Sequence, residues 1–400
     1  MIGGDVDAGY GKIADAFRAN FRDRGEVGAA VAVYRDGVKV VDLWGGHRSG
    51  PAPGPWRSDT MVNMFSTTKG VAALVVAVAV SRGLVSYDAK VSDYWPEFAQ
   101  AGKAEVTVRQ LLGHQAGLSA LQPKPTLADV MEPARLAPIL AAQKPAWRPG
   151  TRHGYHAISL GWYESELIRR TDPAGRTLGR FMADEVVDPM GLDLHIGLPG
   201  TVDRRRVADI HNWKRAETLL HLNEMSPGFL AASLNPVGLT ARTVSIPSGV
   251  DPFAGDYNRE DVRTAEIPSA NGIGTARSVA HLYGSAASGG DELGLSPDVL
   301  AALAAPPIAP SGGVRDRIIH ADVAYSLGFC KPISSFAFGS AGTAFGTPGF
   351  GGSFGCADPD TGIGFAYVMN RLGFHLWSDP RELALRQALF RDILGERPQT

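Results

Sequence analysis

Strand-forming segments stand at the two ends of this 400-residue chain, and a long helical stretch separates them. Near the N-terminus, residues 27–34 and 38–43 are rich in β-branched and aromatic side chains, and Asp36-Gly37 between them is a strong hairpin signal. Strand patterns return only late in the chain, at residues 324–329, 336–338, 354–357 and 363–369. We therefore expect an α+β fold (an α/β sandwich). It would have one antiparallel sheet built from both termini, flanked by helices, with an inserted and mostly helical region.

Helical patterns surround the expected sheet. One covers residues 6–23 and another, residues 380–394, closes the chain. Residues 84–200 read as helices joined by short connections that carry Pro or Gly, and residues 200–265 are less regular. We expect an α/β sheet domain formed by residues 1–83 and 266–400. Residues 84–265 would form an inserted helical domain with lid-like loops.

The composition excludes several classes of partner. Lys and Arg number 39 and Asp and Glu 41, so nothing predicts binding to nucleic acid or to a membrane. Two cysteines, Cys330 and Cys356, exclude a disulfide framework and favour two buried thiols. The N-terminus does not resemble a secretory signal, so we expect a soluble, cytoplasmic protein. No metal or cofactor is predicted, and the oligomeric state is left open.

An uninterrupted apolar run at residues 71–80 is about half as long as a membrane span, so it predicts a buried helix that ends near Gly83. Ser66-Thr67-Thr68-Lys69 stands directly before this run. If the helix starts near Ser66, the hydroxyl and the amine lie one turn apart on the same face. A serine beside a lysine is a nucleophile beside its base.

The expected position of Lys69 suits a base. A free lysine has a pKa of about 10.4, and burial lowers the pKa of a lysine by up to about 3–5 units. The positive end of the helix dipole acts in the same direction. The alternative is an exposed lysine in an ordinary first turn, where lysine is not favoured.

A second proton donor is needed for the leaving group. Tyr155 is the best candidate, because it lies in a loop opened by Pro149-Gly150 just before a helix pattern. A buried structural aromatic residue is the alternative interpretation for this position.

Four motifs in this order resemble the serine β-lactamase and penicillin-binding-protein superfamily. The chain is most similar to its esterase branch, the family VIII carboxylesterases, which are related to class C β-lactamases. The motifs are Ser66-Thr67-Thr68-Lys69, Leu111-Leu112-Gly113-His114-Gln115-Ala116-Gly117-Leu118, Pro149-Gly150 with Tyr155, and Phe345-Gly346-Thr347-Pro348-Gly349-Phe350-Gly351-Gly352. The resemblance extends from about residue 25 to the C-terminal helix.

This resemblance implies a role for each matching residue. Ser66 would be the nucleophile, Lys69 the amine that activates it, and Tyr155 the group that passes a proton to the leaving group. The backbone N–H groups of Ser66 and Phe350 would form the oxyanion hole. The remaining residues of the substrate cleft would be His156, Thr347, Gly349, Gly351 and Gly352.

Two departures from the family pattern bear on the substrate. β-Lactamases and D-alanyl peptidases carry an asparagine two residues after the tyrosine and a Lys-Thr-Gly third motif, whereas this chain has Ala157 and Thr347 at these places. The esterase branch more often has histidine or tryptophan where Thr347 stands. Each missing charge-assisted contact is worth roughly 1.5–3 kcal/mol. A neutral ester is therefore the expected substrate.

Other motifs give weaker predictions. Ser353 lies in a G-x-S-x-G pattern, but the strand, turn and helix that such an elbow needs are missing around it. His153 and His156 lack a third ligand at metal-binding spacing, and His114 is expected to pack or to cap a loop. A polar loop with Glu266, Ser269 and Asn271 is an alternative part of the cleft.

The sequence thus predicts a serine hydrolase that cleaves small to medium neutral carboxylic esters through a covalent acyl-enzyme on Ser66. A β-lactamase or D,D-peptidase, or an acyltransferase of the same superfamily, is the alternative. A non-catalytic binding protein is disfavoured by the intact Ser66, Lys69 and Tyr155.

Overall fold

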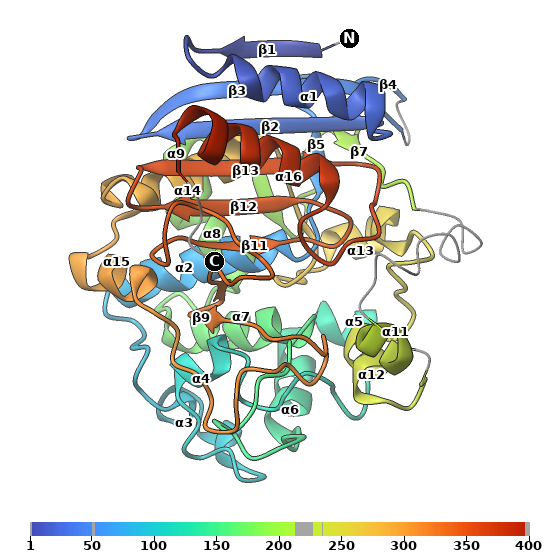
Figure 1. Ribbon diagram of the computed structural model, residues 1–400. Coiled ribbons are helices and arrows are strands. Elements are labelled where there is room, and N and C mark those ends of the chain that lie inside the picture. Colours follow the sequence, from blue (N-terminus) through green and yellow to red (C-terminus); the bar gives the residue numbers. More distant parts are fainter. Residues whose placement is uncertain (1, 50–52, 213–226, 234, 397–400) are drawn as a thin grey trace.

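The computed structural model describes residues 2–49, 53–212, 227–233 and 235–396 (Figure 1). Within these residues the largest unit is a nine-stranded antiparallel sheet with the order β1-β3-β2-β13-β12-β11-β10-β9, and β4 pairs with β3. Its strands are β1 (Ile2–Val6), β2 (Gly28–Arg35), β3 (Val38–Arg48), β4 (Gly54–Pro55), β9 (Tyr325–Ser326), β10 (Phe329–Cys330), β11 (Phe345–Pro348), β12 (Phe354–Asp358) and β13 (Ile363–Met369). N- and C-terminal strands meet where Val33 of β2 lies opposite Phe365 of β13. The α+β fold with a sheet from both termini is confirmed.

Helices cover both faces of this sheet (Figure 1). One face carries α1 (Gly11–Asp23) and α16 (Pro380–Gln387), which continues into a π-helical turn at Ala388–Ile393. The other face carries α14 (Ala276–Ala287) and α2 (Thr67–Ser81). The α2 helix is apolar all round and buried from Thr67 to Ala79, as predicted for the run at residues 71–80.

A mostly helical layer lies below the sheet in Figure 1. Its longest member, α7 (Ser159–Thr171), packs against α2. The other helices of the described chain are α3 (Val91–Tyr94), α4 (Val108–Leu112), α5 (Leu127–Val130), α6 (Pro133–Ala142), α8 (Leu178–Met182) with the π turn Ala183–Val187, α9 (Asp188–Met190), α11 (Pro227–Ser233), α12 (Leu239–Val244), α13 (Glu260–Thr264) and α15 (Pro297–Ala304). Residues 213–226 of the expected lid lie outside the described residues.

A second, smaller sheet holds the chain just before α2. Its strand order is β6 (Leu194–Ile196), β8 (Gly272–Gly274), β5 (Met61–Asn63) and β7 (Val207–Ala208). Strand β5 runs directly into the α2 helix, and its neighbour β8 contacts that helix, because the Gly272 N–H donates to Thr68 Oγ1 at 2.8 Å. The start of α2 is therefore anchored on strands from both halves of the sequence.

The helix predicted over residues 6–23 is wrong at its start. Residues 2–6 form the edge strand β1 instead, paired with residues 41–45 of β3, and α1 begins at Gly11. Gly4 explains the close pairing: its φ is +113°, and a Cβ there would stand 2.0 Å from the Asp42 carbonyl oxygen. The adjacent Gly3 and Gly4 are not typical strand residues, so the sequence pattern did not predict this strand.

Two of the late strand predictions are also wrong. Residues 324–329 do not form one strand, because Leu327 and Gly328 take positive φ angles of 51° and 92° and turn the chain into the short β9–β10 hairpin. Residues 336–338 form no strand and share only an isolated bridge between Ile333 and Phe336. Phe336 and Phe338 pack instead on Phe354.

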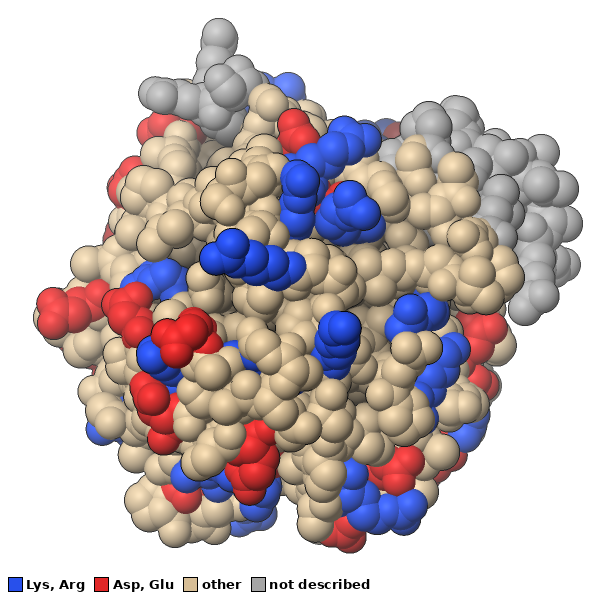
Figure 2. All heavy atoms as spheres, turned by 90° about the horizontal axis from the view of Figure 1, so that it is seen from below, with Lys and Arg blue, Asp and Glu red and all other residues tan. Residues whose placement is uncertain are grey.

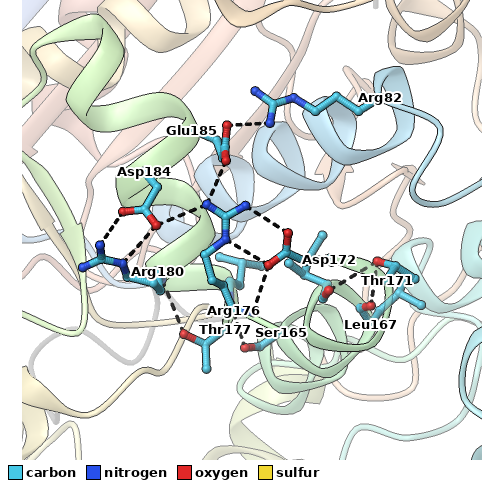
Figure 3. Close-up of polar contacts among 12 residues, drawn as sticks. Arg82, Ser165, Leu167, Thr171, Asp172, Arg176, Thr177, Arg180, Asp184 and Glu185 are labelled. Atoms are coloured by element: carbon cyan, nitrogen blue, oxygen red, sulfur yellow. Dashed lines mark hydrogen bonds and ion pairs between the residues drawn. The ribbon is translucent and has the colours of Figure 1, made fainter. Parts of the chain in front are cut away.

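A cluster of ion pairs joins the far end of α2 to the helical layer (Figure 3). Arg176 binds Asp172 at 2.9 Å, Asp184 at 3.2 Å and Glu185 at 2.8 Å. Glu185 in turn binds Arg82, the residue that follows α2, at 2.5 Å. Because the beginning of α2 is fixed by β8 and its end by this cluster, the helix is held at both ends.

The surface carries mixed charge. Figure 2 shows basic and acidic side chains interspersed over the face seen from below. None of the described helices is both long enough and apolar enough to span a bilayer.

Candidate active site

The chain enters α2 through a strained residue. Phe65, directly before Ser66, has a φ of +45°, a left-handed conformation that bulky residues rarely adopt. Ser66 is the N-cap residue of α2, but its side chain makes no capping hydrogen bond. Its hydroxyl is thus left to face the neighbouring functional groups and the cavity that Ser66 helps to line.

Lys69 lies one turn along the helix and is 1% exposed. Its Nζ donates to the carbonyl oxygens of Ala157 at 2.6 Å and Ser269 at 2.9 Å, and stands 3.2 Å from Ser66 Oγ. Burial lowers the pKa of Lys69 to about 7. A neutral amine has two N–H bonds, which the two carbonyls occupy, so its lone pair is left to accept the Ser66 proton.

Two other buried lysines make the contrast clear. Lys103 donates to the carbonyls of Gln100, Ala141 and Gln143, and Lys331 donates to those of Leu303, Ala304 and Thr343. Three carbonyl acceptors require three N–H bonds, which only the ammonium form supplies. Lys69 alone among these three has a hydroxyl as its third partner.

Tyr155 completes the predicted triad of side chains. Its ring centroid lies 4.7 Å from Lys69 Nζ, and it lines the same cavity as Ser66. Burial raises the pKa of Tyr155, and a hydrogen bond with the Ser66 side chain partly opposes that rise. The structure therefore brings Tyr155 to Ser66 and Lys69, from which it is almost ninety residues away in the sequence.

His156 lies behind Tyr155 and does not line the cavity as expected. It is fully buried, and its Nε2 accepts a hydrogen bond from the Leu118 N–H at 2.9 Å. The proton of the neutral ring is thus on Nδ1, which donates to His114 Nδ1 at 3.1 Å. The backbone N–H of His156 donates to the same His114 atom at 3.0 Å. Burial lowers the pKa of His156 to about 3, so this pair is neutral and supports the tyrosine loop.

Among the described residues, no group of three His, Cys, Asp or Glu side chains is arranged to hold a metal ion. His153 uses its Nδ1 to contact the Gly113 carbonyl at 3.0 Å. Burial lowers its pKa to about 4. The histidines of this region act as packing and hydrogen-bonding groups.

The glycine-rich loop after β11 packs directly on the Ser66 segment. A Cβ on Gly349 would stand 2.4 Å from the Met64 carbonyl oxygen, so only glycine allows this approach. The Gly349 N–H donates to the Ser353 carbonyl at 2.7 Å. Ser353 Oγ in turn donates to the Met64 carbonyl at 2.8 Å and receives the Thr67 hydroxyl at 3.0 Å. Ser353 is 1% exposed and bridges the loop to the helix start.

The cleft glycines and Thr347 are placed differently from the prediction. Pro348 and Phe350 line the cavity, whereas Gly351 and Gly352 are buried against Leu372 and Asp379 on the other side of the loop. Thr347 is 2% exposed, and its hydroxyl lies beside Gly70 on α2. Thr347, Gly351 and Gly352 therefore pack on the side of the loop away from the cavity, and Phe350 lies on the side that faces it.

A buried ion network supports the same loop from the sheet side. Arg381 donates to the Gly351 carbonyl at 3.0 Å and to both oxygens of Asp379, at 2.9 and 3.0 Å. It also contacts Glu26 at 3.3 Å, and Tyr367 donates its hydroxyl to that carboxylate. Helix α16 thereby fixes the loop that carries Phe350.

The cavity in front of Ser66 has a volume of about 180 Å³ and is mostly apolar. None of its described lining residues is Asp or Glu, and the Lys331 ammonium is already bound by three carbonyls. The aromatic residues that line it are Phe65, Tyr155, Phe229, Phe253, Tyr257, Tyr325, Phe336, Phe350, Phe374 and Trp377.

The polar loop with Glu266, Ser269 and Asn271 contributes less than its composition suggests. Glu266 accepts hydrogen bonds from Thr177 and Gly179, and Asn271 binds backbone groups of its own segment. The loop reaches the site through the Ser269 carbonyl, which accepts from Lys69, and through Ala270, which lines the cavity. A backbone carbonyl leaves no signal in the side-chain pattern of a sequence.

Sequence reasoning also missed two buried carboxyl groups. Asp316 is 1% exposed and accepts the N–H groups of Ile318 and Ile319 through its Oδ1. Glu164 lies on α7 behind Lys69. Both residues looked like ordinary polar positions in the sequence, because burial is decided by tertiary packing.

Comparison with known proteins places this geometry in a family. The beta-lactamase family model matches residues 13–389. The esterase/beta-lactamase LipL of Mycobacterium tuberculosis is 33% identical over 377 residues, which is 92% of this chain and 83% of that protein. A solved family VIII carboxylesterase is 36% identical with a TM-score of 0.83, covering 97% of this chain and 98% of the other. A penicillin-binding-protein homologue from Caulobacter crescentus is 37% identical with a TM-score of 0.80, covering 97% and 98%.

Proposed function

The chain belongs to the beta-lactamase family, and we propose that Ser66, Lys69 and Tyr155 perform its chemistry. The protein is a serine hydrolase of the carboxylesterase type. The observation that carries the assignment of residues is the hydrogen bonding of Lys69. Two carbonyls hold its N–H bonds, and Ser66 Oγ lies 3.2 Å from its nitrogen.

Acylation follows from this geometry. The Ser66 oxygen attacks the ester carbonyl carbon while its proton passes to the neutral Lys69 amine. The N–H groups of Ser66 and Phe350 are the proposed donors to the oxyanion that forms, and such donors contribute several kcal/mol to the transition state. When the C–O bond to the alcohol breaks, Tyr155 gives its hydroxyl proton to the leaving oxygen and recovers one from Lys69.

Deacylation uses the same groups in reverse. A water molecule gives a proton through Lys69 and Tyr155 as its oxygen attacks the acyl-enzyme carbonyl. The acid is released when the bond to Ser66 Oγ breaks and Ser66 regains its proton. Every proton is returned, so Ser66, Lys69 and Tyr155 are regenerated at the end of the cycle.

We propose neutral carboxylic esters of small to medium size as substrates. An apolar cavity without a described carboxylate suits an uncharged ester, and Lys331 has no N–H left for a substrate carboxylate. Ala157 supplies no amide for an acylamino side chain. A β-lactam, which carries a carboxylate, would lose these contacts and is the second candidate because LipL is named for both activities.

Fluorophosphonate labelling followed by mass spectrometry tests the proposed nucleophile. We expect one adduct, on Ser66, that is absent in Ser66→Ala and retained in the control Ser353→Ala. An adduct on Ser353, or none on folded protein, would refute the assignment. The substrate class is tested by comparing the turnover of p-nitrophenyl butyrate with that of a chromogenic cephalosporin. Faster hydrolysis of the cephalosporin would make a β-lactam, and not an ester, the preferred substrate.

The cellular location is proposed on separate grounds. Cys330 and Cys356 are both free thiols, as is usual in a reducing cytoplasm. Fractionation of the producing cells would test this, and recovery of the protein outside the cytoplasm would contradict it.

A further inference from the structure

Phe253 is an aromatic residue that the mechanism above does not use. Its side chain is 45% exposed, yet it lines the cavity in front of Ser66. An exposed ring gives up the free energy that its burial would provide. Single exposed apolar residues are nevertheless common on protein surfaces, so the role of this ring follows from its surroundings.

The turn that carries Phe253 is held by several hydrogen bonds. The Phe253 N–H donates to Asp251 Oδ1 at 2.8 Å, and the Asp251 N–H donates to Asp256 Oδ2, also at 2.8 Å. Arg259 pairs with Asp256 at 3.6 Å and donates to the Gly249 carbonyl at 2.8 Å. The backbone of this turn is thus already ordered, which reduces the entropy that a ligand must remove when it binds there.

A row of rings leads from Phe253 to the proposed nucleophile. The Phe253 ring lies edge-on to the Phe350 ring, with centroids 5.3 Å apart and planes at 80°. Phe350 meets Phe65 in the same way, at 5.5 Å and 82°, and Phe65 lies 5.0 Å from Tyr257. All four residues line the cavity, and we call them the aromatic wall. A substrate ring placed against this wall gains edge-to-face contacts beyond the area that it buries.

A second group of cavity residues is attached to the tyrosine loop. Tyr325 stacks on Tyr155, with ring centroids 6.0 Å apart. The Arg317 N–H donates to the His153 carbonyl at 3.0 Å, which ties the nearby cavity residue Ile319 to the same loop. The cavity therefore has one part next to the proposed proton donor and another part formed by the aromatic wall.

The proposed reaction assigns these two parts to the two halves of an ester. The leaving oxygen must reach Tyr155, which protonates it, so the alcohol lies beside the residues attached to the tyrosine loop. The carbonyl oxygen lies at the N–H groups of Ser66 and Phe350. The acyl chain is the remaining substituent of the attacked carbon, and it extends along the aromatic wall.

We propose that Phe253 is a specificity-determining residue that binds the acyl part of the substrate and favours acids that carry an aromatic ring. This role rests on the proposed function, because it uses Ser66, Phe350 and Tyr155 as assigned above. A phenyl ring joined to the carbonyl by two carbons can extend along the wall to Phe253, whereas an acetyl group is too short to reach it. The contact is noncovalent and leaves the chemical steps as described.

The test compares two esters of one alcohol, p-nitrophenyl 3-phenylpropanoate and p-nitrophenyl acetate. The parent should have the larger kcat/KM with the phenylpropanoate. Phe253→Ala should lower the ratio of the two kcat/KM values roughly fivefold, because one aromatic pair is lost. Phe253→Tyr keeps a ring and should retain the parental ratio. Ile308→Ala is the matched control, because Ile308 is 62% exposed and is not among the described cavity residues, so its ratio should also be parental.

A ratio in Phe253→Ala that equals the parental ratio, or that rises, would overturn the proposed role. Ile319→Ala provides a second measurement. It should change kcat/KM for both esters by the same factor, because the two esters share their alcohol, and a lowered ratio in this variant would contradict the assignment of the acyl chain to the aromatic wall.

Fluorophosphonate labelling distinguishes failure of this role from failure of the proposed function. If Ser66 of the parent protein is not labelled, the proposed function is contradicted. Normal labelling with an unchanged ratio in Phe253→Ala contradicts only the role of Phe253.

Discussion

Replacing Ser353 by alanine tests the link between the glycine-rich loop and the start of α2. The Ser353 hydroxyl joins Met64, at 2.8 Å, to Thr67, at 3.0 Å, and it is 1% exposed. Because Met64 and Thr67 flank Ser66, this hydroxyl joins the loop that carries Phe350 to the segment of the proposed nucleophile, while Arg381 holds the loop from the other side. We expect Ser353→Ala to weaken both stability and catalysis without abolishing either.

The expected magnitude follows from the two hydrogen bonds. Removing the hydroxyl leaves the Met64 carbonyl and the Thr67 hydroxyl buried without this partner, at a cost of about 1–3 kcal/mol for each group that stays unpaired. Thr67 can rotate, so we expect the free energy of unfolding to fall by about 2 kcal/mol. A slightly displaced Phe350 N–H should lower kcat roughly tenfold, equivalent to about 1.4 kcal/mol of the barrier, with little change in KM.

Urea unfolding and steady-state kinetics with p-nitrophenyl butyrate measure these two effects. Ser278→Ala is a matched control, because Ser278 is also buried and its hydroxyl hydrogen-bonds to Thr275 and to the Asp193 N–H. It should lose stability but keep kcat. The reasoning fails if Ser353→Ala has parental stability and kcat. It also fails if activity falls by about 10⁶, the loss expected for a missing serine nucleophile.

Three further predictions concern charge. The activity of Lys69 as a base requires its neutral form, so log kcat/KM should fall with a slope near one as the pH drops below about 7. Lys69→Met should be inactive with p-nitrophenyl butyrate. Burial raises the pKa of Asp316 to about 6 in the folded state. The folded protein therefore binds this proton more tightly than the unfolded chain, which stabilises the fold by at most ~3 kcal/mol below about pH 4. This contribution is lost as the pH rises to 6. Urea titrations at pH 4.5 and 7 should show that Asp316→Asn removes this dependence. Arg381→Met should lower the unfolding free energy by about 3–5 kcal/mol, measured by the same titration, because Glu26 and Asp379 lose their buried cation; an unchanged midpoint would contradict the role given to this network.

Local chemistry explains which parts of the fold could be predicted. The hairpin at Asp36-Gly37 was predictable because both residues take positive φ angles, 49° and 76°, that suit Asp and Gly. Helix α2 was predictable because its apolar run is long and Gly83 ends it with a φ of +74°. Where one dominant local signal exists, sequence and structure agree.

Tertiary contacts explain the rest. Edge strand β1 has a glycine-rich pattern with no periodicity, and it forms because β3 provides a pairing edge. The burial of Glu164 and Asp316 depends on which helix or loop covers them, and neighbouring residues do not encode that. Lys69 was predictable as a buried amine, but its two carbonyl partners come from Ala157 and Ser269, far away in the sequence.

The pairing of β2 with β13 has a consequence for the order of assembly. A ribosome makes β2 first and β13 last, so the inner strand of the sheet must wait for its neighbour through most of synthesis. The residues Gly28–Tyr34 are buried in the finished protein, and the edge of β2 that pairs with β13 stays unpaired until then, so we expect this late long-range pairing to slow folding of the nascent chain. The loop that carries Phe350 emerges in the same late stretch. An arrested chain that ends before residue 345 should therefore fail to hydrolyse esters although it already contains Ser66, Lys69 and Tyr155.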